Sequence, residues 1–257
     1  MRQAAVRDVR ALAVHALGMG AKVVGPTRVE WDCAGGCEAP RCVEVWGRSE
    51  RNRPSGAWTR LDMVLFGGVT EKGTMLVEMW VPCRRCRVCL KRRSARWAAR
   101  AHVELAAAPR TWFATFTLSP EARVRFQYRR DLKLLSHGVR PGSLSDDEKF
   151  RELASEVGSE LTKYFKRVRK ESGAPLRYLL VSEAHKDGFP HFHALIHETS
   201  AFNPVRHELL TRQWPWGFTR FKLCPSDSKV AYYVCKYLAK SALTRVRASL
   251  GYGKIGL

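Results

Sequence analysis

Gly188-Phe189-Pro190-His191-Phe192-His193-Ala194-Leu195-Ile196 places two histidines, one residue apart, at the start of an apolar run. Side chains two residues apart in a strand point to the same face of a sheet, so the imidazoles of His191 and His193 are expected to project together. Neutral imidazoles bind divalent metals, and two from one strand supply half of a metal site. Because such pairs are often incidental, the interpretation depends on the neighbouring sequence.

A second strand is predicted just before the histidines. The apolar run Leu176–Ser182 ends at Glu183, and Lys186-Asp187-Gly188 is typical of a hairpin turn. An odd-numbered loop centred on Asp187 would place Glu183 opposite His191 and on its face. A two-residue Asp-Gly turn would instead pair Glu183 with Phe192 and direct the carboxylate away. The sequence leaves both registers open.

A helix is predicted after the histidine strand, over Ala231–Lys240. Tyr233 and Tyr237 are one helical turn apart, and Lys236 and Lys240 fall on the same stripe. Two phenols and two ammonium groups would thus share one side of the helix. The alternative is a stripe of core aromatics, with the lysines extending along it toward solvent.

Three motifs in this order resemble those of the HUH endonucleases, the superfamily of rolling-circle replication initiators. The motifs are the strand Trp112–Leu118, then Pro190-His191-Phe192-His193, then Tyr233-Val234-Cys235-Lys236-Tyr237. The tyrosine spacing is that of initiators from small single-stranded DNA phages. Pro82–Cys89, leading to Arg96, Trp97 and Arg100, further resembles the replication initiation proteins of gokushovirus-type microviruses. The similarity covers residues 82–243, and residues before it match no family that we can name.

The resemblance implies an α+β fold, in which an antiparallel sheet carries helices on one face in the ferredoxin-like arrangement of the HUH core. It also implies a bound Mg²⁺ or Mn²⁺. The residues so implied are, as metal ligands, His191, His193 and Glu183; as nucleophiles, Tyr233 and Tyr237; and as assisting cations, Lys236 and Lys240. Either tyrosine could act first.

The activity implied by the resemblance is nicking and joining of single-stranded DNA at a replication origin through a 5′-phosphotyrosine intermediate. Such a reaction initiates and terminates rolling-circle replication of a small phage genome. The expected partners are the origin strand, a host helicase and the replication polymerase, in the cytoplasm of the bacterial host. The alternatives are a non-catalytic zinc-binding nucleic-acid-binding protein and a single-tyrosine transposase or relaxase of the same superfamily.

The charge of the chain favours a polyanionic partner. The 257 residues include 45 Lys and Arg against 24 Asp and Glu, for a formal net charge of +21. Nucleic acid is the simplest such partner, although a ribosome-associated or membrane-surface protein would share the charge. No apolar run approaches the roughly 20 residues of a transmembrane helix, and charged residues interrupt the N-terminal stretch, which makes a poor signal peptide. A soluble intracellular protein is expected.

A basic helix is expected from Arg84 to Ala108, with no acidic residue between Glu78 and Glu104. Cations at this density would neutralise several phosphates, so binding is expected to weaken steeply with salt. Trp97 could stack on an unpaired base or anchor the core. The candidate DNA-binding residues are Arg84, Arg85, Arg87, Lys91, Arg92, Arg93, Arg96, Trp97 and Arg100.

Six of the eight cysteines form two clusters, Cys33-x3-Cys37-x4-Cys42 and Cys83-x2-Cys86-x2-Cys89. The x2 spacing suits two thiolates on one tetrahedral zinc ion. Two ligands from each cluster would build a structural zinc site. The candidate ligands are Cys33, Cys37, Cys83, Cys86 and Cys89. Free thiols or an iron–sulfur cluster are the alternatives.

Three regions are expected along the chain. Residues 1–82 would form a small β-rich region that zinc stabilises, residues 83–110 a Cys-rich basic helix that links the regions, and residues 111–257 the catalytic domain.

Within these regions, a loop is expected over residues 42–58, before a hairpin of residues 61–66 and 74–81. The strand at 111–118 is expected to lead through a long basic loop to a capping box at Ser145, which opens an amphipathic helix. A short helix over 203–214 and a strand over 218–223 would follow the histidine hairpin.

Overall fold

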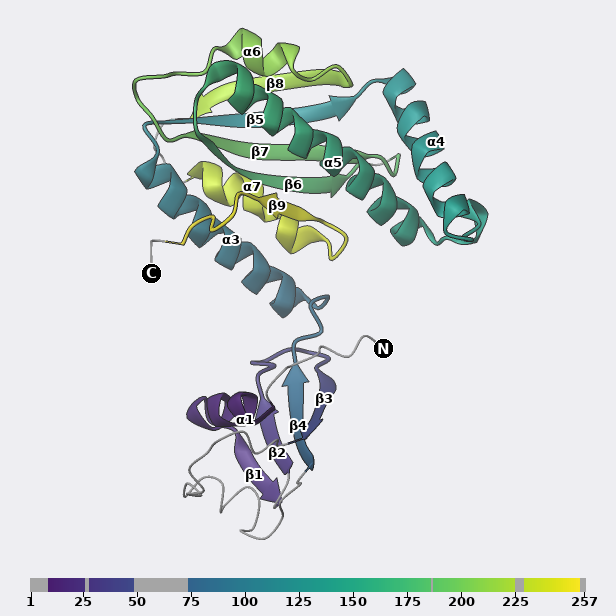
Figure 1. The fold of residues 1–257 in the computed structure, drawn as a ribbon, viewed down its shortest axis with the longest axis vertical. Helices are drawn as coiled ribbons and strands as arrows, with labels where there is room; N and C mark the ends of the chain where they lie inside the picture. Colours follow the sequence, from purple (N-terminus) through teal and green to yellow (C-terminus); the bar gives the residue numbers. More distant parts are fainter. Residues whose placement is uncertain (1–8, 26–27, 49–73, 186, 225–228, 255–257) are drawn as a thin grey trace. The chain divides into compact units, whose positions relative to one another are not determined.

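The computed structural model describes residues 9–25, 28–48, 74–185, 187–224 and 229–254 (Figure 1). The chain forms two compact units, Met1–Cys89 and Leu90–Leu257. The described helices and strands are, in chain order, α1 Val9–Gly18, β1 Lys22–Gly25, β2 Arg28–Asp32, β3 Arg41–Arg48, β4 Thr74–Val81, α3 Arg87–Ala107, β5 Arg110–Leu118, α4 Pro120–Ser136, the 3₁₀ turn η1 Pro141–Ser143, α5 Asp146–Ser172, β6 Leu176–Ala184, β7 Pro190–Glu198, α6 His207–Arg212, β8 Gly217–Cys224, α7 Lys229–Lys240 and β9 Val246–Ala248.

The smaller unit contains a four-stranded sheet of order β1-β2-β4-β3. β2 runs parallel to β4, and the other pairs are antiparallel. Ala13 and Ala16 of α1 pack against Val29 and Val77 of the sheet, and all four side chains are fully buried. The N-terminal region is β-rich, as the sequence predicts.

The expected loop over residues 42–58 is wrong at its start, where β3 pairs with β4 along its whole length. Val43 and Val45 favour extended backbone, and the residues that favour a loop, such as Pro54, come after the strand. β4 confirms the strand predicted over 74–81. The strand predicted over 61–66 lies outside the described residues.

A five-stranded antiparallel sheet of order β8-β5-β7-β6-β9 forms the centre of the larger unit. β5 and β7 are neighbours, as expected for the strand at 111–118 and the histidine strand. β7 is the middle strand, and most of its side chains are buried. The α+β class and the antiparallel sheet are confirmed.

Helices pack on both faces of this sheet, whereas the sequence led us to expect helices on one face. Phe116 of β5 shares a core with Phe165 of α5 on one side. On the other side, Leu195 of β7 shares a core with Leu238 of α7 and Leu105 of α3. The reason is that the central strands carry apolar residues on both faces, so each face requires cover.

The long basic loop expected before Ser145 contains the helix α4. Ser119 caps its first turn, and Pro120 occupies the first helical position, where a missing N–H costs nothing. Phe126 is fully buried, while Arg129 and Lys133 form ion pairs with acidic residues of α5. The basic residues are therefore the outer and pairing sides of a helix.

The helix α5 begins at the predicted capping box, in which Ser145 and Glu148 satisfy each other's backbone N–H groups. It ends at Gly173, whose φ of 63° is a left-handed conformation that glycine adopts readily. The short helix expected over 203–214 is limited to α6. Among the residues that the structure describes, no helix combines the length and the apolar character needed to cross a membrane.

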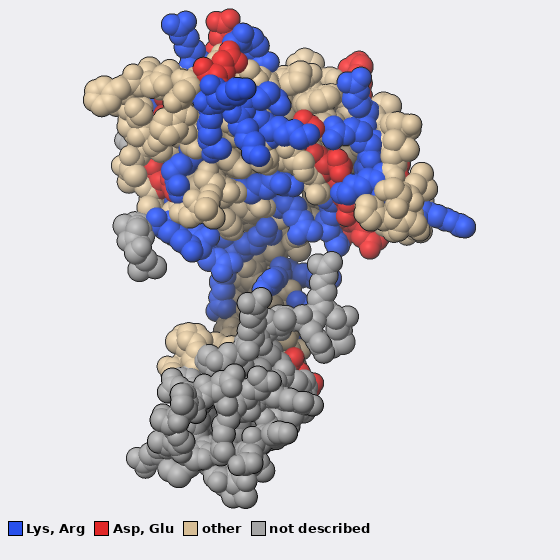
Figure 2. Space-filling view, in the orientation of Figure 1, with Lys and Arg blue, Asp and Glu red and all other residues tan. Residues whose placement is uncertain are grey.

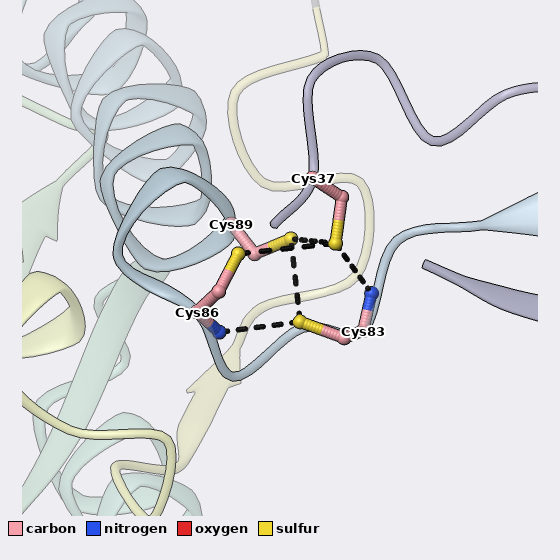
Figure 3. A group of neighbouring side chains, drawn as sticks. All are labelled: Cys37, Cys83, Cys86 and Cys89. Atoms are coloured by element: carbon pink, nitrogen blue, oxygen red, sulfur yellow. Dashed lines mark hydrogen bonds between the residues drawn. The ribbon is translucent and has the colours of Figure 1, made fainter. Parts of the chain in front are cut away.

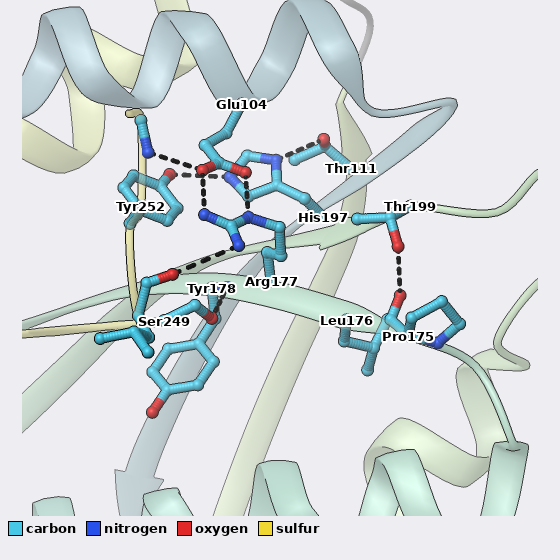
Figure 4. A network of polar contacts seen from close by, with 12 residues as sticks. Glu104, Thr111, Pro175, Leu176, Arg177, Tyr178, His197, Thr199, Ser249 and Tyr252 are labelled. Carbon is cyan, nitrogen blue, oxygen red and sulfur yellow. Dashed lines mark hydrogen bonds and ion pairs between the residues drawn. The ribbon is translucent and has the colours of Figure 1, made fainter. Parts of the chain in front are cut away.

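A buried polar network fastens the segment after β9 to the larger unit (Figure 4). Arg177 of β6 donates two hydrogen bonds of 2.7 Å to Glu104 of α3, and the N–H of Gly253 donates a third of 2.6 Å. Burial alone would raise the pKa of Glu104, but these donors hold it below its usual value. Gly253 has a φ of 62°, and a Cβ there would lie 2.4 Å from that of Arg100, so the position requires glycine.

The same network contains a histidine outside the histidine pair. His197 is fully buried between the hydroxyls of Thr111, at 2.9 Å, and Tyr252, at 2.8 Å. Burial lowers the pKa of His197 to about 4, so the ring is neutral near pH 7. His197 is thus a structural residue, as is the Tyr252 that covers it.

Candidate functional site

The β6–β7 hairpin places Glu183 on the same face as both histidines. Glu183 lies directly opposite His191, and the last pair before the turn is Ala184 with Pro190. Residues 185–189 therefore connect the strands, so the hairpin has the odd-numbered loop rather than the two-residue turn. The carboxylate and the two imidazoles project together from adjacent strands.

Two threonines of β5 hold the histidine rings. The hydroxyl of Thr115 lies 3.3 Å from Nδ1 of His193, and the hydroxyl of Thr117 lies 3.2 Å from Nδ1 of His191. Both Nε2 atoms are consequently left for another partner, and Glu183 Oε2 lies 3.6 Å from Nε2 of His193. Sequence reasoning missed the threonines, although their alternation along residues 111–117 is visible in the sequence.

Both histidines are suited to be neutral ligands. Burial, with the nearby charge of His191 and Lys236, lowers the pKa of His193 to about 3. Burial also lowers the pKa of His191. A neutral imidazole offers a lone pair, which a metal ligand requires. Lys240 Nζ approaches Glu183 Oε1 at 3.3 Å, and within the described part of the chain only four cysteines bring all their ligand atoms within 4.8 Å of one another.

The two tyrosines of α7 are close together but differ in exposure. Tyr237 is 6% exposed and stacks flat on His193, with ring centroids 4.5 Å apart. Tyr233 is 44% exposed, and its ring meets the edge of Phe113. The hydroxyl of Tyr237 donates to that of Tyr233 over 3.4 Å. Burial and this contact raise the pKa of Tyr237 above its usual range.

The lysines of α7 lie against the tyrosine rings. Lys236 Nζ is 3.8 Å from the ring centroid of Tyr233, and Lys240 Nζ is 4.8 Å from that of Tyr237. A cation so near a phenol stabilises its anionic form. Tyr232 is 62% exposed and packs against the ring of His102, apart from the histidine pair.

The comparison with known protein families bears on this site. Residues 111–242, just over half of the chain, match the model of a family of replication-associated proteins, described by its member ORF2. The chain belongs to this family. No curated protein and no solved structure matches it.

The match to the replication-associated family contains every residue of the candidate site, from Thr115 on β5 to Lys240 on α7. Membership of this family supports a role in replication initiation and an interaction with DNA. Lys and Arg side chains cover much of the visible face of the larger unit, in accord with a nucleic-acid partner (Figure 2).

The basic helix α3 precedes the segment that matches the replication-associated family. Its candidate DNA-binding residues differ in their surroundings: Trp97 is partly buried and packs beside Tyr252, Arg100 lies over the Trp97 ring, and Arg93 donates to the carbonyl of Thr244. These three residues have structural contacts within the larger unit. The exposed candidates are Arg84, Arg85, Arg87, Lys91, Arg92 and Arg96.

Four cysteines of the smaller unit, all before the family segment in the chain, come together in space (Figure 3). The sulfur atoms of Cys37, Cys83, Cys86 and Cys89 all lie within 4.8 Å of one another. One ligand therefore comes from the first cluster and three from the second, which corrects the expected two from each. Cys33 lies outside the group, and its thiol donates to the carbonyl of Trp80 instead.

The backbone around Cys83 is shaped like a metal knuckle. Arg84 adopts a φ of 63°, which turns the N–H groups of Arg85 and Cys86 toward the Cys83 sulfur at 3.4 and 3.2 Å. These donors lower the pKa of Cys83 to about 6. Burial raises the pKa of Cys89 to about 12, so a bound cation is what would convert the remaining thiol to a thiolate.

Proposed function

We propose that this chain nicks and rejoins single-stranded DNA at a replication origin by an HUH mechanism, and so starts and ends rolling-circle replication of a small phage genome. One observation supports this most directly. An exposed tyrosine, Tyr233, lies beside a cluster of two neutral imidazoles and a carboxylate, within a replication-associated family segment. A free 3′ hydroxyl left by nicking would prime the host polymerase in the bacterial cytoplasm.

The donor set fits a divalent cation such as Mg²⁺ or Mn²⁺. The threonine contacts at Nδ1 leave Nε2 of His191 and His193 as ligand atoms, and Glu183 supplies a carboxylate oxygen. A cation bound there would neutralise the charge of the scissile phosphate. Lys240, which contacts Glu183, would remain as a nearby cation for the phosphate.

Removing both threonine hydroxyls, in the variant Thr115→Val with Thr117→Val, is expected to weaken Mn²⁺ binding about 10- to 100-fold, because ligand rings held by such hydrogen bonds lose their orientation. Isothermal titration calorimetry with Mn²⁺ measures the affinity. Thr111→Val is the matched control, since its hydroxyl contacts His197 rather than the histidine pair. Equal affinities for the double variant and the control would contradict the role of the two threonines.

The proposed step exchanges one phosphate ester for another. The phenolic oxygen of Tyr233 attacks phosphorus and gives up its proton, and the bond from phosphorus to the 3′ oxygen breaks. The 3′ oxygen takes up a proton, and the 5′ phosphate stays on the tyrosine. Because the number of ester bonds is conserved, rejoining requires no further energy source. Lys236, 3.8 Å from the Tyr233 ring centroid, favours the anionic phenol during attack.

Exposure distinguishes the two tyrosines. Tyr233 faces solvent and can meet a phosphate at once, whereas Tyr237 is buried against His193. We therefore assign the first cut to Tyr233. Tyr237 would act second, on the regenerated origin, after its ring leaves the histidine.

The burial of Tyr237 favours one alternative within the superfamily. A single-tyrosine enzyme would use Tyr233 alone, and Tyr237 would serve as packing that holds His193 in place. The two cases differ in whether Tyr237 ever becomes bonded to DNA.

Covalent capture tests the proposed function. Labelled single-stranded circles with candidate origin sequences are incubated with the protein in Mn²⁺ or in EDTA, and adducts are separated under denaturing conditions. We expect an adduct in Mn²⁺ only, lost in His191→Ala and in His193→Ala because each removes a ligand. His185→Ala is the control, since His185 is exposed and pairs with Asp187 in the turn. Tight binding without an adduct across a broad oligonucleotide library would favour the non-catalytic DNA-binding protein.

We also propose that Cys37, Cys83, Cys86 and Cys89 hold a structural zinc ion. Tetrahedral zinc with bonds to sulfur of about 2.3 Å separates its sulfur ligands by about 3.8 Å. The observed sulfur separations of 3.5 Å between Cys89 and Cys37, and 3.8 Å between Cys37 and Cys86, fit that geometry.

A further inference from the structure

The edge strand β8 presents one aromatic and two cationic side chains on the face that carries the histidines. Phe218, Arg220 and Lys222 alternate along the strand and so share a face. Phe218 lies opposite Thr117 and Arg220 opposite Thr115, which are the threonines that hold the two histidine rings. β8 thus continues the rows of the candidate site outward to the edge of the sheet.

The distance along such a row is short. Arg220 is two strands away from His193, which at a spacing of about 4.8 Å per strand puts their Cα atoms about 10 Å apart. One strand of duplex DNA carries a phosphate about every 3.4 Å along its axis, so only a few nucleotides separate the two positions. A strand with its scissile phosphate at the histidines would reach β8.

The side chains on β8 are open to a ligand. Phe218 is 69% exposed, and Arg220 and Lys222 are also exposed. In the described residues neither cation forms an ion pair. An exposed aromatic ring beside cations without acidic partners is the arrangement that binds unpaired bases and the phosphates between them.

A groove joins this strand to the tyrosine helix. It is open, has a volume of about 460 Å³, and is lined by Phe113, His193, Arg220, Lys222, Lys229 and Tyr233 among others. Its lining includes cations from both β8 and α7, an aromatic floor, one of the two histidines and the exposed tyrosine. The positive charge of the lining suits a polyanion, and the groove leads directly to the reacting groups.

We infer that β8 and this groove bind the unpaired DNA strand on one side of the scissile phosphate. Phe218 stacks on a base, while Arg220 and Lys222 contact phosphates. A duplex is the wrong ligand, because its bases are already stacked on one another and offer no free face to Phe218. The inference rests on the proposed nicking function for the position of the scissile phosphate, but binding itself requires no cleavage.

The test measures binding without catalysis. Fluorescence anisotropy follows a labelled single-stranded oligodeoxynucleotide, and the same sequence as a duplex, in EDTA over a series of salt concentrations. Phe218→Ala is expected to weaken single-strand binding roughly 5- to 150-fold, the range for loss of one base–aromatic stack. Arg220→Ala with Lys222→Ala is expected to make the log–log salt slope shallower by about 1.4, since each phosphate contact contributes about 0.7.

Matched controls lie elsewhere on the larger unit. Phe202 is 98% exposed, so Phe202→Ala removes an exposed phenylalanine outside β8. Lys166 and Lys170 are exposed on α5, which packs on the other face of the sheet, so Lys166→Ala with Lys170→Ala removes the same charge there. Phe218→Trp is expected to restore binding.

Single-strand binding lost in the β8 variants but kept in the controls supports the inference. Equal losses in Phe218→Ala and Phe202→Ala, an unchanged salt slope, or equal weakening of duplex binding would overturn it. Failure of the proposed function is distinguishable: adducts would be absent from the wild-type protein in Mn²⁺, while its anisotropy response to the β8 changes would persist.

Discussion

Tyr233→Phe is expected to abolish the first covalent protein–DNA adduct, with a loss of at least about 10⁴-fold in cleavage rate, because the attacking oxygen is removed. The phenylalanine ring keeps the contacts with Phe113 and with the Lys236 ammonium group, so the helix and its surroundings should be preserved. The measurement is the rate of adduct formation on a labelled origin strand in Mn²⁺, with the modified residue identified by peptide mapping.

Tyr237→Phe separates the two-tyrosine mechanism from the single-tyrosine alternative. In the two-tyrosine mechanism the variant still makes the first cut, but no circle is closed after the origin is regenerated. In the single-tyrosine case it both cuts and closes, and Tyr237 remains a packing residue. Tyr232→Phe is the control, since Tyr232 packs against His102 and should leave both reactions unchanged. An adduct that forms on Tyr237 before Tyr233 would contradict the assigned order.

Cys83→Ser is expected to remove zinc from the protein and to unfold the smaller unit. Zinc binding contributes about 10–16 kcal/mol in zinc-finger peptides, which is comparable to or larger than the whole stability of a typical domain. The buried apolar cluster in the described part of this unit is small, so little else would hold it. Elemental analysis measures the zinc content, and hydrogen exchange of β2, β3 and β4 measures the unfolding.

Cys42→Ser is the control for the zinc prediction. Cys42 is exposed on β3, opposite Trp80 of β4, and lies outside the four-cysteine group. It should retain about one zinc ion per chain and the exchange protection of the wild-type protein. Full zinc content in Cys83→Ser, or none in the wild-type protein, would disprove the structural zinc site.

The parts of the site that the sequence predicts are those whose geometry is local. His191 and His193 share a face because a strand has a period of two, and Tyr233 and Tyr237 share a stripe because a helix has a period near four. Glu183 was different. Its direction depended on the number of residues in the turn, and only the observed pairing with His191 resolved that choice.

The remaining features depend on contacts between distant segments. Thr115 and Thr117 matter only because β5 lies beside β7. A basic composition hid the helix α4, whose cations find acidic partners on α5. Likewise the spacing of the cysteines could not select Cys37 over Cys33, because that choice depends on how the chain passes the knuckle at Cys83.

The buried network around His197 has a consequence for how the protein is made. Glu104 requires the N–H of Gly253, and His197 the hydroxyl of Tyr252, so these buried groups find their last partners only after the ribosome has delivered residues about 150 and 55 positions further on. The four thiols of the smaller unit, in contrast, are all present by Cys89. At a synthesis rate of about 5–20 residues per second, the metal knuckle can form several seconds before the sheet of the larger unit is sealed. A nascent chain would thus capture its metal first and gain a completed nuclease fold last.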